Sequence, residues 1–341
     1  MTFPTRKIAG QDVSAISFGV MSMGGAYGTF EGDDEARFKV LDAAFDAAQG
    51  CTPMFDTADI YGDAEDLLGN WFKRTGKRDK VFLASKFGFI AFTGDKVIDG
   101  SPAYARQALE KSIKRMQVDC IDLYYLHRAD RDVPIEHTIR AMAEFVKEGK
   151  VKYLGLSEVS VSTLRRAHAV HPIAAVQVEY SPFTLDIEDP KIALLNTCRE
   201  LGVAVVAYSP LGRGLLSGTI RSYDDIPAGD FRRLVPRYSA DNFPNILKIA
   251  DGLAAIGKKY DNASASQVAL AWLLAQGEDI IPIPGSKTIK YLEENYSAVK
   301  VALSVEDVAV IRKLAVEADA STGSRYPPSL AAELFTDTPV L

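Results

Sequence analysis

Residues 153–179 read YLGLSEVSVSTLRRAHAVHPIAAVQVE, two short, mostly apolar runs separated by a helical pattern. The runs at 153–157 and 175–179 are typical of strands that are buried on both faces of a sheet. A strand, a helix and a second strand in succession indicate a parallel sheet, because parallel neighbours need a connection that crosses from one end of the sheet to the other. This stretch therefore predicts an α/β protein.

The same unit recurs along the whole chain. Eight strand candidates alternate with helical patterns: Ala15–Met21, Met54–Ala58, Val81–Lys86, Asp122–His127, Tyr153–Ser157, Ala175–Glu179, Ala204–Tyr208 and Ile280–Pro284. Helix starts are visible between them, for example at Ser101, a capping residue followed by Pro102 at the first helical position. The count of eight favours a closed (β/α)8 (TIM) barrel over an open, doubly wound sheet.

One domain is expected to span residues 1–341, because no linker rich in Pro, Gly or Ser divides the chain. Two segments are additional to the eight strand–helix units of a minimal barrel. Residues 212–242 are expected to form a long loop after strand 7, where loops of this fold shape the active site. Residues 323–341 form a C-terminal tail that either closes over the pocket or packs under the barrel.

Composition narrows the classes of function. The net charge is −6, from 39 Lys and Arg against 45 Asp and Glu, and basic residues do not cluster, so nucleic-acid binding is not expected. The sequence contains no apolar run of about 18 residues and no signal-peptide pattern, so neither a membrane span nor secretion is expected. Three widely spaced cysteines indicate reduced thiols and a cytoplasmic location. Nothing marks an interface patch, and the oligomeric state stays open.

Four polar residues stand at or just beyond the ends of successive strands: Asp56, Tyr61, Lys86 and His127. Each alone has an ordinary explanation, as a surface ion pair, a rim or core tyrosine, or a hydrogen-bonded core histidine. Together they occupy the end of the barrel at which enzymes of this fold place catalytic groups. The sequence therefore predicts a catalytic tetrad.

The chemistry of such a tetrad is coherent. A tyrosine hydroxyl has a pKa of about 10, which a nearby Lys ammonium would lower. A carboxylate would keep that ammonium charged, and an imidazole N–H would orient a carbonyl oxygen and share its developing charge. The four side chains include no source of electrons, so a redox reaction would need a bound hydride carrier.

Two glycine-containing stretches are candidates for phosphate binding. Gly212–Gly218 reads GRGLLSG, a GxGxxxG spacing that does not fit the dinucleotide fingerprint of open sheets. Residues 284–287, PGSK, follow strand 8 and lead into a helix, which is the usual phosphate site of barrels. Lys287 and Arg213 would supply the cations.

The sequence resembles the aldo-keto reductase superfamily over nearly its whole length. The motifs follow one another in the same order: FDTADIYGDAEDLLG at 55–69, ASKFG at 84–88, LYYLHR at 123–128, GLSE at 155–158, QVEYSPF at 177–183, AYSPLGRGLLSG at 207–218 and PGSKTIKYLEEN at 284–295. The resemblance implies the barrel, a nicotinamide cofactor and Tyr61 as acid–base catalyst, with the other three tetrad members as its partners.

The resemblance also implies a set of cofactor contacts. Ser157 and Gln177 would hold the nicotinamide carboxamide, and Tyr208 would stack on the ring. The remaining implied contacts run from the pyrophosphate to the adenine: Ser209, Pro210, Leu211, Arg213, Gly214, Ser217, Gly285, Lys287, Tyr291, Glu294 and Asn295. Many members have a longer polar or cationic side chain beside the 2′-phosphate, where this chain has Tyr291. Lys287 alone would therefore carry the preference for NADPH over NADH.

One departure from the family pattern concerns strand 5. Many members have Asn after Ser157, whereas this chain has Glu158. The GLSE variant, together with stretches like RRAHAVHP at 165–172, resembles a branch of plant and fungal reductases of aldehydes, alkaloid aldehydes and pyridoxal. A carboxylate at this position could accept from the carboxamide NH2.

The prediction is thus NADPH-dependent reduction of an aldehyde or ketone to the alcohol, with Tyr61 as general acid. Tyr27, Phe89, Tyr125 and Arg128 would line the substrate pocket. Ordinary core packing explains the three aromatic residues equally well, and for Arg128 a surface ion pair is slightly favoured over contact with an acidic group of the substrate.

Two alternatives remain open, and a third is disfavoured. Some members of the superfamily are cofactor-binding regulatory subunits of membrane channels. A barrel lyase would use Lys86 as a Schiff-base nucleophile. A metal-dependent hydrolase is disfavoured, because the four histidines (His127, His137, His168 and His171) contain no HxH pair, and no metal is expected.

Overall fold

Eight parallel strands form the centre of the molecule in the computed structural model, which describes residues 2–25, 30, 32–90 and 96–341. They are β3 (Phe18–Gly19), β4 (Met54–Asp56), β5 (Phe82–Phe87), β6 (Ile121–Leu126), β7 (Val151–Ser157), β8 (Ile173–Glu179), β9 (Ala204–Tyr208) and β10 (Ile280–Pro282). Each strand pairs with its neighbours in sequence order. A parallel bridge between Gly19 and Gly285, and a hydrogen bond from Ser17 N to Pro282 O (3.0 Å), connect the first strand with the last. The predicted (β/α)8 barrel is confirmed.

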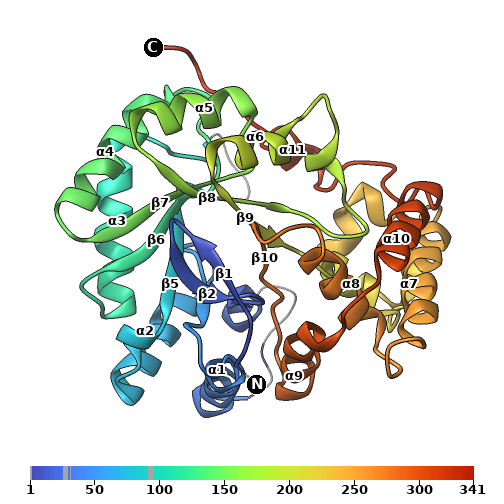
Figure 1. Ribbon diagram of the computed structural model, residues 1–341. Coiled ribbons are helices and arrows are strands. Elements are labelled where there is room, and N and C mark those ends of the chain that lie inside the picture. The colour runs from blue at the N-terminus through green and yellow to red at the C-terminus, as the bar shows by residue number, and fades with distance from the viewer. Residues whose placement is uncertain (1, 26–29, 31, 91–95) are drawn as a thin grey trace.

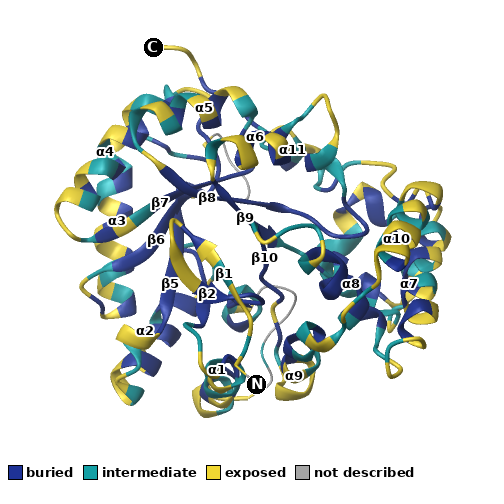
Figure 2. Ribbon diagram, viewed as in Figure 1, coloured by how far each residue is buried: buried dark blue, intermediate teal, exposed yellow. Residues whose placement is uncertain are grey.

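Helices surround the strands (Figure 1). They are α1 (Asp34–Ala47), α2 (Ala64–Thr75), α3 (Pro102–Met116), α4 (Ile135–Lys147), α5 (Val161–Val170), α6 (Leu194–Leu201), α7 (Phe243–Gly257), α8 (Ala265–Leu274), α9 (Ile289–Ser297), α10 (Val305–Glu317) and α11 (Pro328–Ala331). Figure 2 shows the strands buried and the outward faces of the helices exposed. The predicted start of α3 is confirmed, since Ser101 Oγ accepts a hydrogen bond from Tyr104 N at 3.2 Å.

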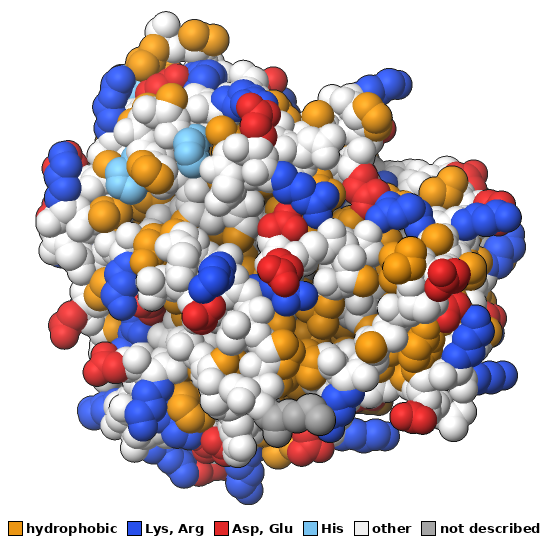
Figure 3. All heavy atoms as spheres, viewed as in Figure 1, with side chains coloured by type: hydrophobic (Ala, Val, Ile, Leu, Met, Phe, Trp, Pro, Cys, Tyr) orange, Lys and Arg blue, Asp and Glu red, His pale blue; other side chains and the backbone are white. Residues whose placement is uncertain are grey.

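The surface carries both signs of charge. Lys and Arg side chains are interspersed with Asp and Glu over the face shown in Figure 3. Among the helices of the described residues, none combines the length and the apolar character needed to cross a membrane.

An N-terminal hairpin was not predicted. β1 (Thr5–Ile8) and β2 (Gln11–Ser14) pair antiparallel, and the turn between them has positive φ at both Ala9 (47°) and Gly10 (83°). This is the turn geometry that matches strand twist in two-residue hairpins, but an Ala-Gly pair is a weak signal for it. β3 is shorter than the predicted strand at 15–21, because the chain leaves β2 only at Ser14 and a 3₁₀ turn begins at Met21.

The long loop after β9 contains four short 3₁₀ turns: Gly212–Ser217, Tyr223–Asp225, Phe231–Leu234 and Pro236–Tyr238. The C-terminal tail runs along this loop, because Arg237 N donates to Ser324 O at 3.1 Å. It then reaches the end of β7, where Thr336 forms a parallel bridge with Val159. The tail therefore lies on the face of the barrel that carries the carboxyl ends of the strands.

The interior of the barrel is filled by apolar side chains. Tyr125 is fully buried there, with Met54, Leu123 and Ile281 and with Ile8 from the hairpin. Figure 2 shows this central region as buried. The barrel is therefore a packed core below its carboxyl-end face, as expected for this fold.

Gly155 gives a test of that packing. A Cβ atom at this position would lie 2.4 Å from Cδ1 of Tyr125, a ring atom held in the core. We expect Gly155→Ala to lower the free energy of unfolding by about 2 kcal/mol, because overpacking forces neighbouring side chains from their positions. Urea unfolding followed by circular dichroism measures the change.

The control is Gly155→Ala combined with Tyr125→Leu, which makes room for the added methyl group. The double variant should lose less stability than the sum of the two single variants. A Gly155→Ala protein within about 0.5 kcal/mol of the wild type would contradict this account of the barrel interior.

Candidate active site

A cavity of about 730 Å³ opens at the carboxyl ends of the strands. Its lining comes from the ends of β3, β4, β6, β7, β8, β9 and β10, from the loop after β9 and from the tail. Cavities of this size hold small molecules and cofactors. The lining includes Asp56, Tyr61 and His127, three of the four predicted catalytic residues.

The fourth, Lys86, lies directly behind this wall. Its Nζ donates hydrogen bonds to Asp56 Oδ1 and to Thr57 O, both at 2.6 Å, and the side chain is fully buried. The second oxygen of Asp56 accepts from Gln177 Nε2 at 2.8 Å. The ammonium also lies 4.9 Å from the centre of the Tyr61 ring.

In the Asp56–Lys86 pair, each partner opposes the effect of burial on the pKa of the other. Burial raises the pKa of Asp56, which Lys86 and the Gln177 hydrogen bond counteract. Burial lowers the pKa of Lys86, which the Asp56 carboxylate counteracts. Because Lys86 has no exposed surface and its donors serve two acceptors, the Schiff-base alternative is not favoured.

Tyr61 follows β4 and faces the cavity with its ring perpendicular to that of His127, the centroids 5.8 Å apart. Burial, and then the Asp56 carboxylate, raise the pKa of Tyr61 above its ordinary value. The net direction is upward and not the predicted fall, and the charge that opposes the rise is that of Arg128. A raised pKa keeps the hydroxyl protonated at neutral pH, which is the form required of a proton donor.

His127 is held in its neutral form. Burial, and then the charges of Arg128 and Lys86, lower the pKa of His127 well below its ordinary value. Its Nδ1 is buried and has no hydrogen-bond partner among the residues that the structure describes. A neutral imidazole can donate one hydrogen bond to an oxygen in the cavity.

Every residue that the resemblance implied as a cofactor contact lines the same cavity. These residues are Ser157, Gln177, Tyr208, Ser209, Pro210, Leu211, Arg213, Gly214, Ser217, Gly285, Lys287, Tyr291, Glu294 and Asn295. The structure thus brings them together with the tetrad in one elongated site, and their contacts with a cofactor stay predictions.

Positive-φ turns and a glycine shape the backbone around the cavity. The chain turns sharply after β9, with positive φ at Ser209 (49°), Arg213 (56°) and Gly214 (90°). After β10, a Cβ at Gly285 would lie 3.1 Å from Gly19 O and 3.2 Å from Ser22 Oγ, so a glycine there allows the chain to lie close to the end of β3. Ser22 Oγ lines the cavity and has no hydrogen-bond partner among the described residues.

Two further cations line the cavity near Lys287, and neither was predicted. Arg232 comes from the loop after β9, where its Nη2 pairs with Asp230 at 2.8 Å and its Nη1 donates to Arg213 O at 3.1 Å. Lys290 lies in the first turn of α9. Lys290 stands three residues after Lys287, just inside the helix start that follows the PGSK stretch, and this proximity is a signal that the sequence contains. The path of the Arg232 loop is not encoded in any local pattern.

The predicted substrate-pocket residues do not all lie at the cavity. Arg128 lines the cavity, is 5% exposed, and its Nη1 donates to Ser157 Oγ at 3.2 Å. Phe89 is buried 5.7 Å from the His127 ring. Tyr125 lies inside the barrel core and does not line the cavity, so core packing accounts for it. Tyr27 lies outside the described residues.

Glu158 does not face the cavity. Its carboxylate accepts hydrogen bonds from Arg325 of the tail and from the Tyr208 hydroxyl. The expected contact of this carboxylate with a nicotinamide carboxamide is therefore not supported. No local sequence signal indicated the pairing, because the two residues are 167 positions apart.

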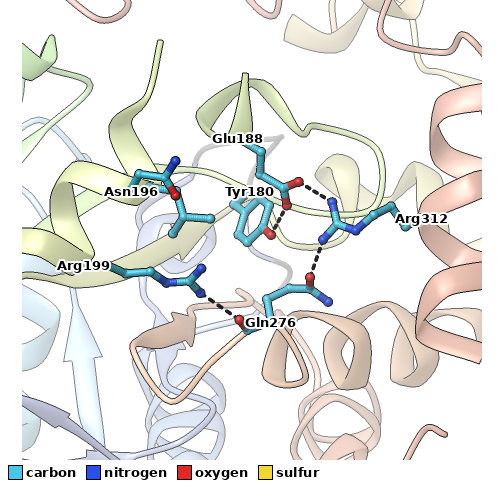
Figure 4. A pocket seen from close by; sticks show the side chains of 7 residues that line it. Tyr180, Glu188, Asn196, Arg199, Gln276 and Arg312 are labelled. Atoms are coloured by element: carbon cyan, nitrogen blue, oxygen red, sulfur yellow. Dashed lines mark hydrogen bonds and ion pairs between the residues drawn. The ribbon is translucent and has the colours of Figure 1, made fainter. Parts of the chain in front are cut away.

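A second cavity, of about 270 Å³, lies outside the barrel between α6, α8 and α10. Figure 4 shows hydrogen bonds and ion pairs among the residues that line it: Glu188 accepts from Tyr180 and Arg312, and Arg199 donates to the backbone carbonyl of Gln276 at 2.7 Å. Within the described residues, no group of three His, Cys, Asp or Glu side chains is arranged to hold a metal ion. The candidate active site is therefore the larger cavity.

Comparison with known proteins gives the family. The sequence model of the Aldo/keto reductase family matches residues 15–316. The chain belongs to the aldo/keto reductase family. An aldo-keto reductase of Strobilurus tenacellus is 58% identical over 324 residues, with 94% of each chain covered. An aldo-keto reductase of Schizosaccharomyces pombe, whose name specifies NADP(+), is 47% identical over 343 residues, with 99% of each chain covered.

Solved aldo-keto reductase structures share the fold. A glycerol dehydrogenase from Gluconobacter oxydans superposes with a TM-score of 0.80 at 26% identity, covering 94% of this chain and 97% of that one. An aldo-keto reductase from Klebsiella pneumoniae in complex with NADPH has a TM-score of 0.70 at 24% identity, covering 99% and 100%. The predicted family and the enzyme class, an NAD(P)H-dependent oxidoreductase, are confirmed.

The neutral state of His127 can be tested in solution. Its ring resonances, followed by NMR on ¹⁵N-labelled protein and assigned with His127→Gln, should not titrate between about pH 5.5 and 8, because burial and two nearby cations lower the pKa of this ring. A titration with a midpoint near the ordinary value of about 6.5 would contradict the account.

Proposed function

We propose that this aldo/keto reductase uses NADPH to reduce an aldehyde or ketone to the alcohol, with Tyr61 as the proton donor. The observation that carries the proposal is the arrangement of one elongated cavity. Tyr61 and His127 line one part of it, backed by the buried Asp56–Lys86 pair, and cations line another. A reaction centre and an anion-binding region in one site suit a phosphorylated hydride carrier.

The cavity fits a nicotinamide dinucleotide in its chemistry. Three features of the lining support this fit: the buried Ser22 hydroxyl has no partner among the described residues, the chain turns sharply after β9, and a glycine stands at position 285. Ser157, Gln177 and Tyr208 would hold the nicotinamide end, and the loops after β9 and β10 the phosphates. The relative from Schizosaccharomyces pombe, named for NADP(+), supports this choice of cofactor. When bound, the cofactor supplies a hydride to the carbonyl carbon.

The side chains of the tetrad handle the carbonyl oxygen. Neutral His127 would donate a hydrogen bond to this oxygen and orient it. Tyr61 would transfer its hydroxyl proton to the same oxygen as the alcohol forms, and would recover a proton from solvent afterwards. The Lys86 ammonium would stabilise the phenolate charge left on Tyr61, and Asp56 holds that ammonium in place.

Three cations support a preference for NADPH over NADH. Lys287 lines the cavity together with Lys290 and with Arg232, whose charge is paired with Asp230, whereas Lys287 alone was expected to supply the charge. Tyr291, which is 49% exposed, would then flank the extra phosphate without pairing with it.

An aldehyde is the proposed substrate class, and the cytoplasm is the proposed location of the enzyme. The free state of Cys51, Cys120 and Cys198 supports this location.

Turnover separates the reductase from the regulatory subunit considered as the alternative. With an aromatic aldehyde, we expect the wild type to consume NADPH faster than NADH. The loss of absorbance of the reduced nicotinamide measures the rate of consumption. Tyr61→Phe keeps the ring and removes the transferable proton, so kcat should fall by about 10³-fold. NADPH fluorescence should show that the variant still binds cofactor.

Two results would overturn the proposal. Cofactor binding without turnover over a broad panel of aldehydes and ketones would favour the regulatory role. Tyr61→Phe with kcat within about threefold of the wild type would remove Tyr61 from the chemistry.

A further inference from the structure

The tail is fixed to the barrel just before it reaches the active site. Asn242 Nδ2 donates to Ala320 O at 2.6 Å, and Arg237 Nε donates to Gly323 O at 3.1 Å. Gly323 has a φ of 88°, and a Cβ there would lie 3.2 Å from Arg237 N, so the tail lies close against the loop after β9. These contacts deliver Arg325 and Tyr326 to the end of β7.

Arg325 enters a buried cluster of acids. Its Nη2 and Nη1 donate to the two oxygens of Glu158 at 2.9 and 3.0 Å, and both side chains are at most 2% exposed. Glu179 and Asp186 lie 3.5 and 3.6 Å from the same guanidinium. A planar, bidentate pair of this kind fixes direction as well as distance.

Glu158 is committed to this role. Burial alone would raise the pKa of Glu158, but the Arg325 guanidinium lowers it to about 2, so the carboxylate is ionised at neutral pH. The backbone of the same residue holds the tail a second time, since Thr336 N donates to Glu158 O at 3.1 Å. Glu158 has a φ of 51°, a conformation that is uncommon away from glycine and that persists where the surroundings impose it.

The next residue of the tail, Tyr326, is placed by this anchor. Its hydroxyl donates to the Tyr208 hydroxyl at 3.2 Å, and the Tyr208 hydroxyl donates to Glu158 Oε1 at 2.8 Å. The guanidinium carbons of Arg213 and Arg128 lie 4.7 and 5.8 Å from the centre of its ring. Tyr326 thus shares the cavity wall with Tyr61 and His127 while its hydroxyl and ring are held by neighbours.

We propose that Tyr326 is a specificity-determining residue of the carbonyl subsite, and that Glu158 and Arg325 are positioning residues that hold it there. The proposal rests on the proposed function of the cavity. Removing the Tyr326 ring would enlarge the subsite and favour bulky carbonyl compounds. Neutralising Glu158 would leave Arg325 without its bidentate partner, release the tail and change substrate preference in the same direction.

The experiment compares kcat/KM for a bulky aldehyde, 2-naphthaldehyde, with that for a small one, propanal. Tyr326→Ala should raise the ratio of the two by about tenfold relative to the wild type. Tyr326→Phe retains the ring and should keep the wild-type ratio within about twofold. Glu158→Gln should raise the ratio, and hydrogen exchange of residues 320–326 should become faster.

Glu333→Gln is the matched control. It breaks another ion pair of the tail, between Glu333 and Arg131 at 3.6 Å, away from the cavity lining. The control should leave the ratio unchanged. A circular dichroism spectrum and melting temperature like those of the wild type establish that each variant is folded.

A ratio within about twofold of the wild type in Tyr326→Ala would overturn the role of Tyr326. Unchanged exchange of residues 320–326 in Glu158→Gln would overturn the anchor, whether or not the protein turns over an aldehyde. If the wild type reduces neither aldehyde, the proposed function fails separately, and the exchange measurement still tests the anchor.

Discussion

The buried ion pair between Lys86 and Asp56 is the constraint on which the site depends. Two charges removed from water cost several kcal/mol each unless they are paired and their remaining donors and acceptors are satisfied. Here Thr57 O and the Gln177 amide complete the hydrogen bonding. The ends of β4, β5 and β8 are thereby held at fixed distances, and Tyr61 lies above the pair. Apolar packing below them, closed by the β1–β2 hairpin, supports the pair from inside the barrel.

A second buried charge cluster organises the opposite side of the same cavity. Glu158 and Glu179 face Arg325 and Arg213, and Tyr208 joins the cluster through its hydroxyl. Through this cluster the tail contributes a wall to a site that otherwise belongs to the strand ends. The two clusters have different roles. The first supports transfer of the Tyr61 proton, and the second fixes the shape of the pocket and the position of Tyr208.

Much of this arrangement could be predicted from the sequence. The strands are apolar runs with clear breaks, and Lys86 and His127 stand at or next to strand ends, so local patterns were sufficient to place the tetrad on one face. Tyr125 had two explanations, the substrate pocket and core packing, and core packing is the correct one. Side chains alternate along a strand, and Tyr125 points inward two residues before His127, so it fills the layer beneath the active site. The sequence contains this alternation.

Other features depend on contacts between distant segments, which local patterns do not encode. The pairing of Glu158 with Arg325 joins the end of β7 to the tail, and the position of Arg232 depends on the folded path of the loop after β9. The turn at Ala9 and Gly10 lacks the residues that usually mark a hairpin. The direction of the Tyr61 pKa likewise depends on burial, which outweighs the opposing charge of Arg128.

The most direct measurement of the central claim is the single-turnover rate of NADPH oxidation by Lys86→Met, with the dissociation constant of NADPH measured on the same protein. The account predicts a rate lower by about 10²-fold or more, because the charge left on Tyr61 loses its partner, while the dissociation constant stays within about threefold of the wild type. A near wild-type rate would contradict the account. So would loss of NADPH binding with unchanged chemistry, because the pair would then serve the cofactor and not the proton.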